Sequence, residues 1–312
     1  MSEGDLLADR KRLKQGLNSW RTIAVLALFG AAAVLVQQYG GPIKGGKGAM
    51  PGSHYIAELK VENIISDDAE RDELIEQIKE DNDAKALIVW FDSPGGTTVG
   101  GEELYLQLKA VSKEKPVVGV MRTLCASACY MASLGTDHVL ARNSSLTGSI
   151  GVLMESVEVS RLADKLGVTP ITITSGKYKD VPSMTKPITD EERAYLKETI
   201  DDAYDQFVEL VAQRRGLSKE YTREVADGRI YTGRQALPLK LIDGIGGVEE
   251  ARLWLEKEKK IDKDLPIELI EPEPEYPSLF THLSQWAGIE IFNRSAIGLD
   301  GLISIWQHSP VQ

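Results

Sequence analysis

The chain has 312 residues, of which 42% are hydrophobic, so it is long enough for one large α/β domain or two small ones. Its formal net charge is -11 at pH 7, from 47 acidic and 36 basic residues. Because binding of nucleic-acid phosphates needs clustered Lys and Arg, this balance argues against nucleic acid as the main partner.

The first predicted element is a membrane-spanning helix over residues 22–39. Ile23–Val36 is an uncharged apolar run. Counted from Trp20 to Tyr39, the segment has the roughly 20 residues that a membrane-spanning helix needs, with an aromatic residue at each interface. The basic residues before it are Arg10, Lys11, Arg12, Lys14 and Arg21. By the positive-inside rule, residues 1–21 are predicted to be cytoplasmic and everything after the helix to lie outside. A cleaved signal peptide is the alternative, although no small-residue cleavage site follows the run.

A linker rich in glycine and proline, residues 40–53, leads to a predicted globular domain over residues 54–270. In this domain apolar runs alternate with segments of helical periodicity. The predicted strands are Tyr55–Leu59, Ala86–Phe91, Val117–Met121, Asp137–Ala141, Gly151–Met154 and Ile171–Thr174. Helices are predicted after Asp68, around residues 103–108 and after Ser127. This alternation predicts βαβ units around a mainly parallel sheet.

The last long element of the domain is a helix that starts at a capping box, Thr189 with Glu192, and stops at Gly216. After Glu268 an acidic, proline-containing stretch opens a C-terminal tail over residues 271–312. The tail mixes aromatic and aliphatic residues. It could stay loosely ordered, dock on the domain, pack against a neighbouring subunit or touch the membrane surface, and the residues leave these alternatives open.

Three short segments of the domain carry candidate chemistry. Ser127 lies among small residues at a predicted helix start, Lys179 lies in a predicted turn, and Gly95 and Gly96 follow a buried strand. A serine hydroxyl is a weak nucleophile, and a lysine can act as its base when burial lowers the lysine pKa. Because glycines have no side chain, the backbone at Gly95 and Gly96 could approach a substrate carbonyl closely. One backbone N–H from these glycines and the N–H of Ala128 could then stabilise the oxyanion. The combination indicates acyl transfer by a serine–lysine pair.

The two cysteines of the chain, Cys125 and Cys129, bracket Ser127. If the segment is helical, their spacing gives poor geometry for a disulfide, so we expect two small, buried, unbridged side chains. A cysteine nucleophile is disfavoured because no histidine lies near in sequence to activate it.

The four histidines do not form a catalytic or metal-binding pattern. His138 lies in a predicted strand and is interpreted as structural, and the others are His54, His282 and His308. The chain has no His-x-x-x-His motif, and no Gly-x-Gly-x-x-Gly motif precedes a helix. We therefore expect neither a metal nor a cofactor, and because no histidine is suitably placed we expect a lysine to be the base for Ser127.

Five motifs occur together in the domain. They are Asp-Ser-Pro-Gly-Gly at 92–96, Ala-Ser-Ala-Cys-Tyr at 126–130, Leu-Thr-Gly-Ser-Ile-Gly-Val at 146–152, Ser-Gly-Lys-Tyr-Lys-Asp at 175–180, and Gly-Arg-Ile-Tyr-Thr-Gly-Arg-Gln-Ala at 228–236. As a set, they resemble the signal peptide peptidase A family of membrane-anchored serine peptidases, which share the Clp protease/crotonase fold. The resemblance runs from about Tyr55 to Ala251, roughly two thirds of the chain.

The resemblance implies a serine peptidase domain of repeated ββα and βαβ units, preceded by one transmembrane helix. It makes Ser127 the nucleophile and Lys179 the general base. It also implies that Gly96 and Ala128 supply the oxyanion N–H groups, with Gly95 beside them, and that Ser149 supports the lysine amine. The chain departs from the family pattern in two places. Ala128-Cys129 replaces the common Gly-Gly, and Asp92 replaces a frequent Asn.

The resemblance further implies an endopeptidase on the outer face of a bacterial inner membrane that degrades released signal peptides and similar short apolar segments. It implies a ring-like homo-oligomer and leaves open whether Ser127 and Lys179 meet within one chain or between two. The alternatives are a non-proteolytic scaffold on the same fold, a crotonase-like acyl-CoA enzyme, and a protease for specific membrane proteins.

Overall fold

The computed structural model describes residues 53–272 and 303–305. The elements in chain order are β1 (Tyr55–Ile65), α2 (Ala69–Glu80), β2 (Ala84–Thr97), α3 (Thr98–Glu114), β3 (Val117–Ala126), α4 (Ala128–Ser133), β4 (His138–Ala141), β5 (Leu146–Gly148), α5 (Ser160–Leu166), α6 (Asp190–Arg215), α7 (Lys219–Val225), β6 (Ile230–Thr232), α8 (Gly233–Ala236), β7 (Gly244–Ile245), α9 (Val248–Lys259), β8 (Ile267–Leu269) and β9 (Ile303–Ile305). The predicted anchor over 22–39 and nearly all of the tail lie outside these residues. Within the described part, none of the helices has both the length and the apolarity of a membrane span.

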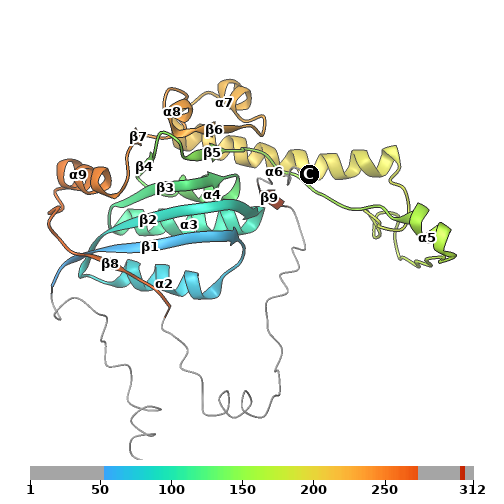
Figure 1. The fold of residues 1–312 in the computed structure, drawn as a ribbon, viewed down its shortest axis with the longest axis horizontal. Helices are drawn as coiled ribbons and strands as arrows, with labels where there is room; N and C mark the ends of the chain where they lie inside the picture. Colours follow the sequence, from blue (N-terminus) through green and yellow to red (C-terminus); the bar gives the residue numbers. More distant parts are fainter. Residues whose placement is uncertain (1–52, 273–302, 306–312) are drawn as a thin grey trace, which may run out of the picture. The chain divides into compact units, whose positions relative to one another are not determined.

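One mainly parallel sheet forms the centre of the described domain (Figure 1). Its strand order is β6-β5-β3-β2-β1-β8, with β4 beside β3, β7 beside β4, and β9 beside β2. The pairs β5–β6 and β2–β9 are antiparallel, and the other pairs of the described sheet are parallel. The predicted α/β class with a mainly parallel sheet is therefore confirmed.

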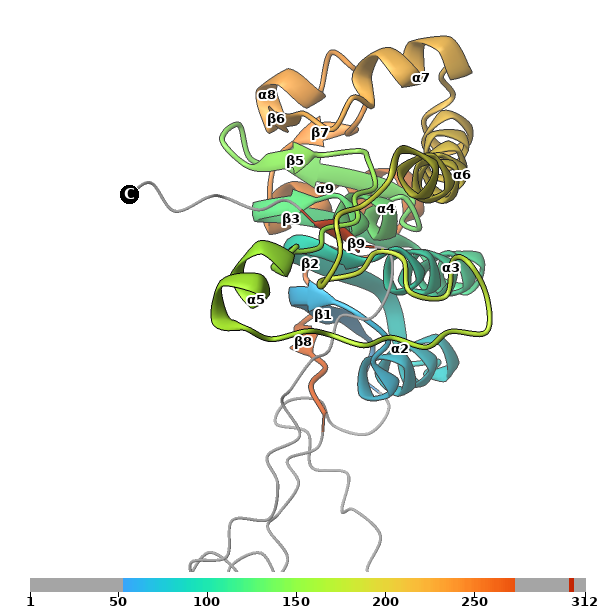
Figure 2. The same ribbon diagram turned by 90° about the vertical axis from the view of Figure 1, so that its right-hand side faces the viewer.

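Alternate residues of the central strands pack into two separate cores, because successive side chains of a strand point to opposite faces. On one face, residues such as Ala57 and Val89 join the larger core with the buried sides of α2, α3 and α6. On the other face, Ile56 and Ile88 pack with Leu255 of α9. Figure 2 shows α2 and α3 together on one side of the strands. Covering both faces is what makes the long apolar runs of β2 and β3 stable in a parallel sheet.

β2 continues beyond Phe91, the last residue of the predicted strand. Instead of ending before Asp92, it runs through both glycines to Thr97 and keeps its pairing with β1, Ile65 lying opposite Gly96. The strands approach so closely there that a Cβ built on Gly96 would lie 1.7 Å from the Ile65 carbonyl oxygen. Gly96 thus allows close packing of β2 on β1.

Two of the predicted strands do not form. Residues 151–154 and 171–174 form no strand of the sheet, and Leu153 alone makes an isolated β-bridge. Ile171 and Ile173 are 85% and 93% exposed, so their apolar alternation does not reflect burial in this chain. Residues 153–188, which include α5, have no buried side chain, and we call them the arm. Figure 1 shows α5 away from the sheet.

Candidate active site

The C-terminal ends of three neighbouring strands bring most of the predicted site residues to one edge of the sheet. β2 ends with Gly95, Gly96 and Thr97, β3 ends just before Ser127, and β5 ends just before Ser149. The Ser127 N–H donates a hydrogen bond of 2.8 Å to the carbonyl of Gly148, the last residue of β5. In open parallel sheets this edge is where ligand sites form.

Ser127 lies in a strained turn between β3 and α4. Its backbone has φ 58° and ψ -119°, a conformation that a residue with a Cβ adopts rarely and at a cost of roughly 1–3 kcal/mol. Gly95, Gly148 and Ser149 at the same edge also have positive φ, at 113°, 86° and 50°. Such residues cluster at functional sites, and a strained strand-to-helix turn is also how α/β-hydrolases present a nucleophilic serine.

The residues that flank the serine turn are tightly packed. Ala128 is fully buried, and a Cβ built on Gly101 of α3 would lie 2.9 Å from its methyl carbon, so the methyl faces α3. Asp92 accepts a 3.1 Å hydrogen bond from the N–H of Leu124. This bond joins β2 to β3 where their register shifts. The aspartate that departs from the family pattern therefore has a structural contact with the neighbouring strand.

Ser149 is one of the residues that line a cavity next to the end of β5. Its N–H donates a 2.8 Å hydrogen bond to the Arg229 carbonyl, and its side chain is mostly buried. The cavity has a volume of about 410 Å³ and is lined by the residues after β5, by α6 through Tyr204, and by Gly228. Gly148 is absent from the predicted site residues, because a strand of three residues has no recognisable period in the sequence.

Lys179 is placed apart from this edge, on the arm. The turn that carries it packs on the first turns of α6, where Lys177 pairs with Glu191 and the Tyr178 ring stacks on Tyr195 at 4.5 Å. Lys179 itself is exposed, whereas Ser127 is only 1% exposed. The structure thus groups the predicted nucleophile and oxyanion residues within one chain and leaves the predicted base outside that group.

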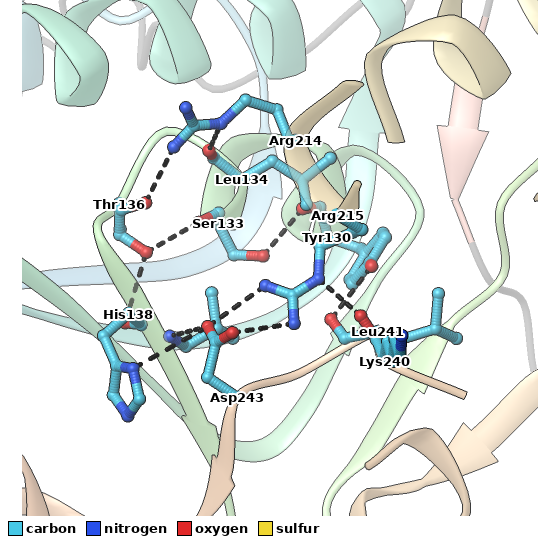
Figure 3. Close-up of polar contacts among 11 residues, drawn as sticks. Tyr130, Ser133, Leu134, Thr136, His138, Arg214, Arg215, Lys240, Leu241 and Asp243 are labelled. Atoms are coloured by element: carbon cyan, nitrogen blue, oxygen red, sulfur yellow. Dashed lines mark hydrogen bonds and ion pairs between the residues drawn. The ribbon is translucent and has the colours of Figure 1, made fainter. Parts of the chain in front are cut away.

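The far end of α4, the helix that begins after Ser127, is held by a polar network. Tyr130 donates its hydroxyl to the Leu241 carbonyl at 2.9 Å, and Arg214 of α6 donates to the Leu134 carbonyl at 2.7 Å. The network comprises Tyr130, Ser133, Leu134, Thr136, His138, Arg214, Arg215, Lys240, Leu241 and Asp243 (Figure 3). It therefore fixes α4 to α6 and to the chain before β7.

His138 belongs to this network and not to the site edge. Its ring stacks on Trp254 at 4.7 Å, and its Nδ1 lies 4.0 Å from Asp243. Burial lowers its pKa from the ordinary value, which favours the neutral ring. The structural interpretation of His138 is confirmed.

The expectation that the cysteines are unbridged is wrong. Both are fully buried, as predicted, but they form a disulfide with a Cα–Cα distance of 5.1 Å. The prediction assumed one helix through both residues. Cys125 instead lies on β3 and Cys129 on α4, so the turn at Ser127 brings the two side chains together.

The start of α6 gives a pH prediction, because a carboxylate caps this end of the helix. Glu192 accepts from the Thr189 N–H at 2.9 Å and from Lys186 at 3.0 Å, and these bonds lower its pKa to about 2. A lowered pKa means that the stabilisation is present above the ordinary value of 4.5 and is lost as pH falls toward about 2. We expect the backbone amides at the start of α6 to exchange their hydrogens with solvent faster as pH falls over that range. The Glu192→Gln variant should lack this pH dependence of the exchange rates. An identical pH profile in both proteins would contradict the prediction.

Residues 109–262 match the model of peptidase family S49. A protein of Synechocystis sp. that is named as a protease is 39% identical over 223 residues, which cover 70% of this chain and 80% of that protein. A protein of Enterococcus faecium named as a signal peptide peptidase is 32% identical over 268 residues, covering 81% of this chain and 76% of the relative. Among solved structures, a mutant of the 1510-N membrane-bound stomatin-specific protease aligns with a TM-score of 0.47 and 14% identity over 71% of this chain and 100% of that one. The chain therefore belongs to peptidase family S49.

Proposed function

We propose that the chain is a membrane-anchored serine endopeptidase that uses Ser127 as nucleophile and Lys179 as general base. Membership of peptidase family S49 supports hydrolysis of peptide bonds. The strained turn at Ser127, with the glycines of β2 beside it, supports the choice of nucleophile. The anchor over residues 22–39 would place the catalytic domain on the outer face of a bacterial inner membrane.

The observation that carries the proposal is a peptide strand bound beside the proposed oxyanion site. β9 pairs antiparallel with the end of β2, Ile305 lying opposite Gly95, Ser304 opposite Gly96 and Ile303 opposite Thr97. Both views place β9 next to the end of β2 and near α4 (Figures 1 and 2). Extended peptides bind to free strand edges in this way, through main-chain hydrogen bonds. The edge at Gly95–Thr97 therefore suits a peptide substrate.

In the proposed mechanism, the Ser127 Oγ attacks the scissile carbonyl carbon while the Lys179 amine takes the hydroxyl proton. The negative oxygen of the tetrahedral intermediate accepts hydrogen bonds from the N–H groups of Gly96 and Ala128. Lys179 then donates the proton to the leaving amine, and the C–N bond breaks. Water attacks the resulting ester by the same route, which releases the acid product and restores Ser127.

The exposed position of Lys179 bears on how the base is activated. A lysine acts as a base near neutral pH when burial disfavours its charged form, and this chain alone leaves Lys179 in solvent. The arm also exposes a series of apolar side chains, namely Leu153, Val157, Leu162, Leu166, Val168, Ile171, Ile173 and Met184. We propose that the arm packs on a neighbouring subunit of a ring-like homo-oligomer, where Lys179 reaches the Ser127 of the other chain.

The proposed substrates are released signal peptides and similar short apolar segments. A relative from Enterococcus faecium carries the name of a signal peptide peptidase. Peptides of this kind are left in the membrane after cleavage of secreted proteins, which fits a catalytic domain tethered at its outer face. Specific membrane proteins are the alternative substrate class.

The test is hydrolysis of a tagged apolar peptide by the full chain in detergent, followed by treatment with a fluorophosphonate. We expect two peptide products and a single covalent adduct, which peptide mapping locates at Ser127. Ser149, the other strained serine at this edge, is the internal control and should stay unmodified. No turnover, or an adduct at Ser149 instead of Ser127, would overturn the proposal.

A further inference from the structure

The disulfide Cys125–Cys129 closes a small ring around the proposed nucleophile. The ring encloses three residues, Ala126, Ser127 and Ala128. These are the nucleophile and the residue whose N–H is proposed to stabilise the oxyanion, together with the last residue of β3. Both cysteines are fully buried. The bridge therefore joins the strand before the strained turn to the helix after it.

Each side of the ring is attached to a rigid part of the domain. Cys125 pairs with Ser93 of β2 and with Thr147 of β5, and its carbonyl also accepts a 2.8 Å hydrogen bond from the Thr147 hydroxyl. Cys129 lies in α4, whose far end is held by the polar network of Figure 3. The turn between them is the only part of the segment with disfavoured backbone angles, at Ser127.

A strained turn persists when its surroundings leave it no relaxed alternative. Without this restraint, Ser127 could adopt helical backbone angles. That change would extend α4 by one residue and turn the Ala128 N–H away from the proposed oxyanion position. A bond from Cys125 to Cys129 opposes that change, because it fixes the distance across the turn. We propose that this disulfide is a positioning element for Ser127, and that peptidase activity depends on its oxidation. The inference rests on the proposed role of Ser127.

The redox step is an exchange with a dithiol. Two electrons and two protons pass from the dithiol to the cysteine pair, which gives two buried thiols and the cyclic disulfide of the reagent. Because both sulfurs are shielded by the core, exchange is expected to be slow in the folded chain. The enzyme would thus be assembled in its active form where cysteines oxidise and would stay poorly active where they are kept reduced.

The experiment compares the oxidised full chain in detergent with the same protein after prolonged treatment with dithiothreitol, on one tagged apolar peptide. Thiol counting after denaturation verifies the state of the pair. We expect reduction to lower kcat about tenfold with KM unchanged, because the turn and not the peptide-binding edge is affected. The activity should follow a two-electron curve against the ambient thiol–disulfide potential. The double variant Cys125→Ala with Cys129→Ala should show the same low kcat and no response to the dithiol.

Met131→Leu is the matched control, since Met131 is buried in the same helix but lies outside both the ring and the polar network. It should keep the full response to reduction. Reduced and oxidised proteins with equal kcat, or two free thiols in the fully active enzyme, would overturn this inference while leaving the proposed function intact. Absence of turnover in both forms would refute the proposed function and this inference together.

Discussion

Replacing Ser127 or Lys179 by alanine is expected to lower kcat by roughly 10⁴- to 10⁶-fold, the loss seen when the nucleophile or its base is removed from a serine hydrolase. Mixing the two inactive variants, by co-expression, should restore about a quarter of the wild-type turnover if every site takes one residue from each of two chains in a ring. We expect this recovery because Lys179 is exposed in its own chain, whereas the proposed site is buried. The measurement is hydrolysis of a tagged apolar peptide by purified mixed oligomers.

Two controls make the mixing experiment interpretable. Ser127→Ala mixed with the double variant Ser127→Ala/Lys179→Ala should stay inactive, because no intact serine is present. Lys165→Ala removes an equal charge from the same arm and should keep wild-type turnover, since Lys165 is an exposed residue of α5. A mixture with no recovered activity would mean that the pair meets within one chain. Wild-type turnover in Lys179→Ala would remove the lysine from the mechanism.

Gly96→Ala is expected to damage both the fold and the site. The added carbon would lie 1.7 Å from the Ile65 carbonyl oxygen, so β1 and β2 must separate. Overpacking of this kind costs about 1–3 kcal/mol in the free energy of unfolding. Moving the Gly96 N–H away from the oxyanion should also lower kcat by about 10²–10³-fold, the loss typical of one missing donor. Urea unfolding and peptide hydrolysis measure the two effects separately.

Gly176→Ala is the matched control for the stability effect. A Cβ at Gly176 meets no atom within 4 Å, so the free energy of unfolding should change by less than about 0.5 kcal/mol. Equal stability and kcat in Gly96→Ala and the wild type would show that β2 does not pass so close to Ile65.

The parts of the fold that follow from local chemistry could be predicted from the sequence. The apolar run Ala86–Phe91 indicates a strand buried on both faces, and β2 is such a strand. Asp68 and the Thr189–Glu192 box mark helix starts through side-chain bonds to the backbone only a few residues away. These signals are reliable because both partners are close in sequence.

The errors concern features that depend on residues distant in sequence or on a local backbone conformation that the residue types do not reveal. Gly95 and Gly96 follow the predicted strand Ala86–Phe91, and only the carbonyl of Ile65 on another strand shows why glycine is needed at position 96 inside β2. Ile171 and Ile173 have the period of a strand but have no strand beside them in the described sheet. The cysteine bridge depends on the backbone angles of Ser127, which no residue type indicates. For the site, the candidate nucleophile and oxyanion residues were identified from motifs, and their assembly at one edge of the sheet required the strand order.

The antiparallel pairing of β9 with β2 has a consequence for specificity. Successive side chains of a strand point to opposite faces, so a peptide held along Gly95–Thr97 would present every second residue to the domain and the residues between them to the opposite side. Recognition would then depend on alternate positions of the substrate and tolerate variation between them. In a peptide library varied one position at a time, substitutions at every second position should change the cleavage rate, and substitutions at the positions between them should not. Equal sensitivity at neighbouring positions would argue against binding in the direction of β9.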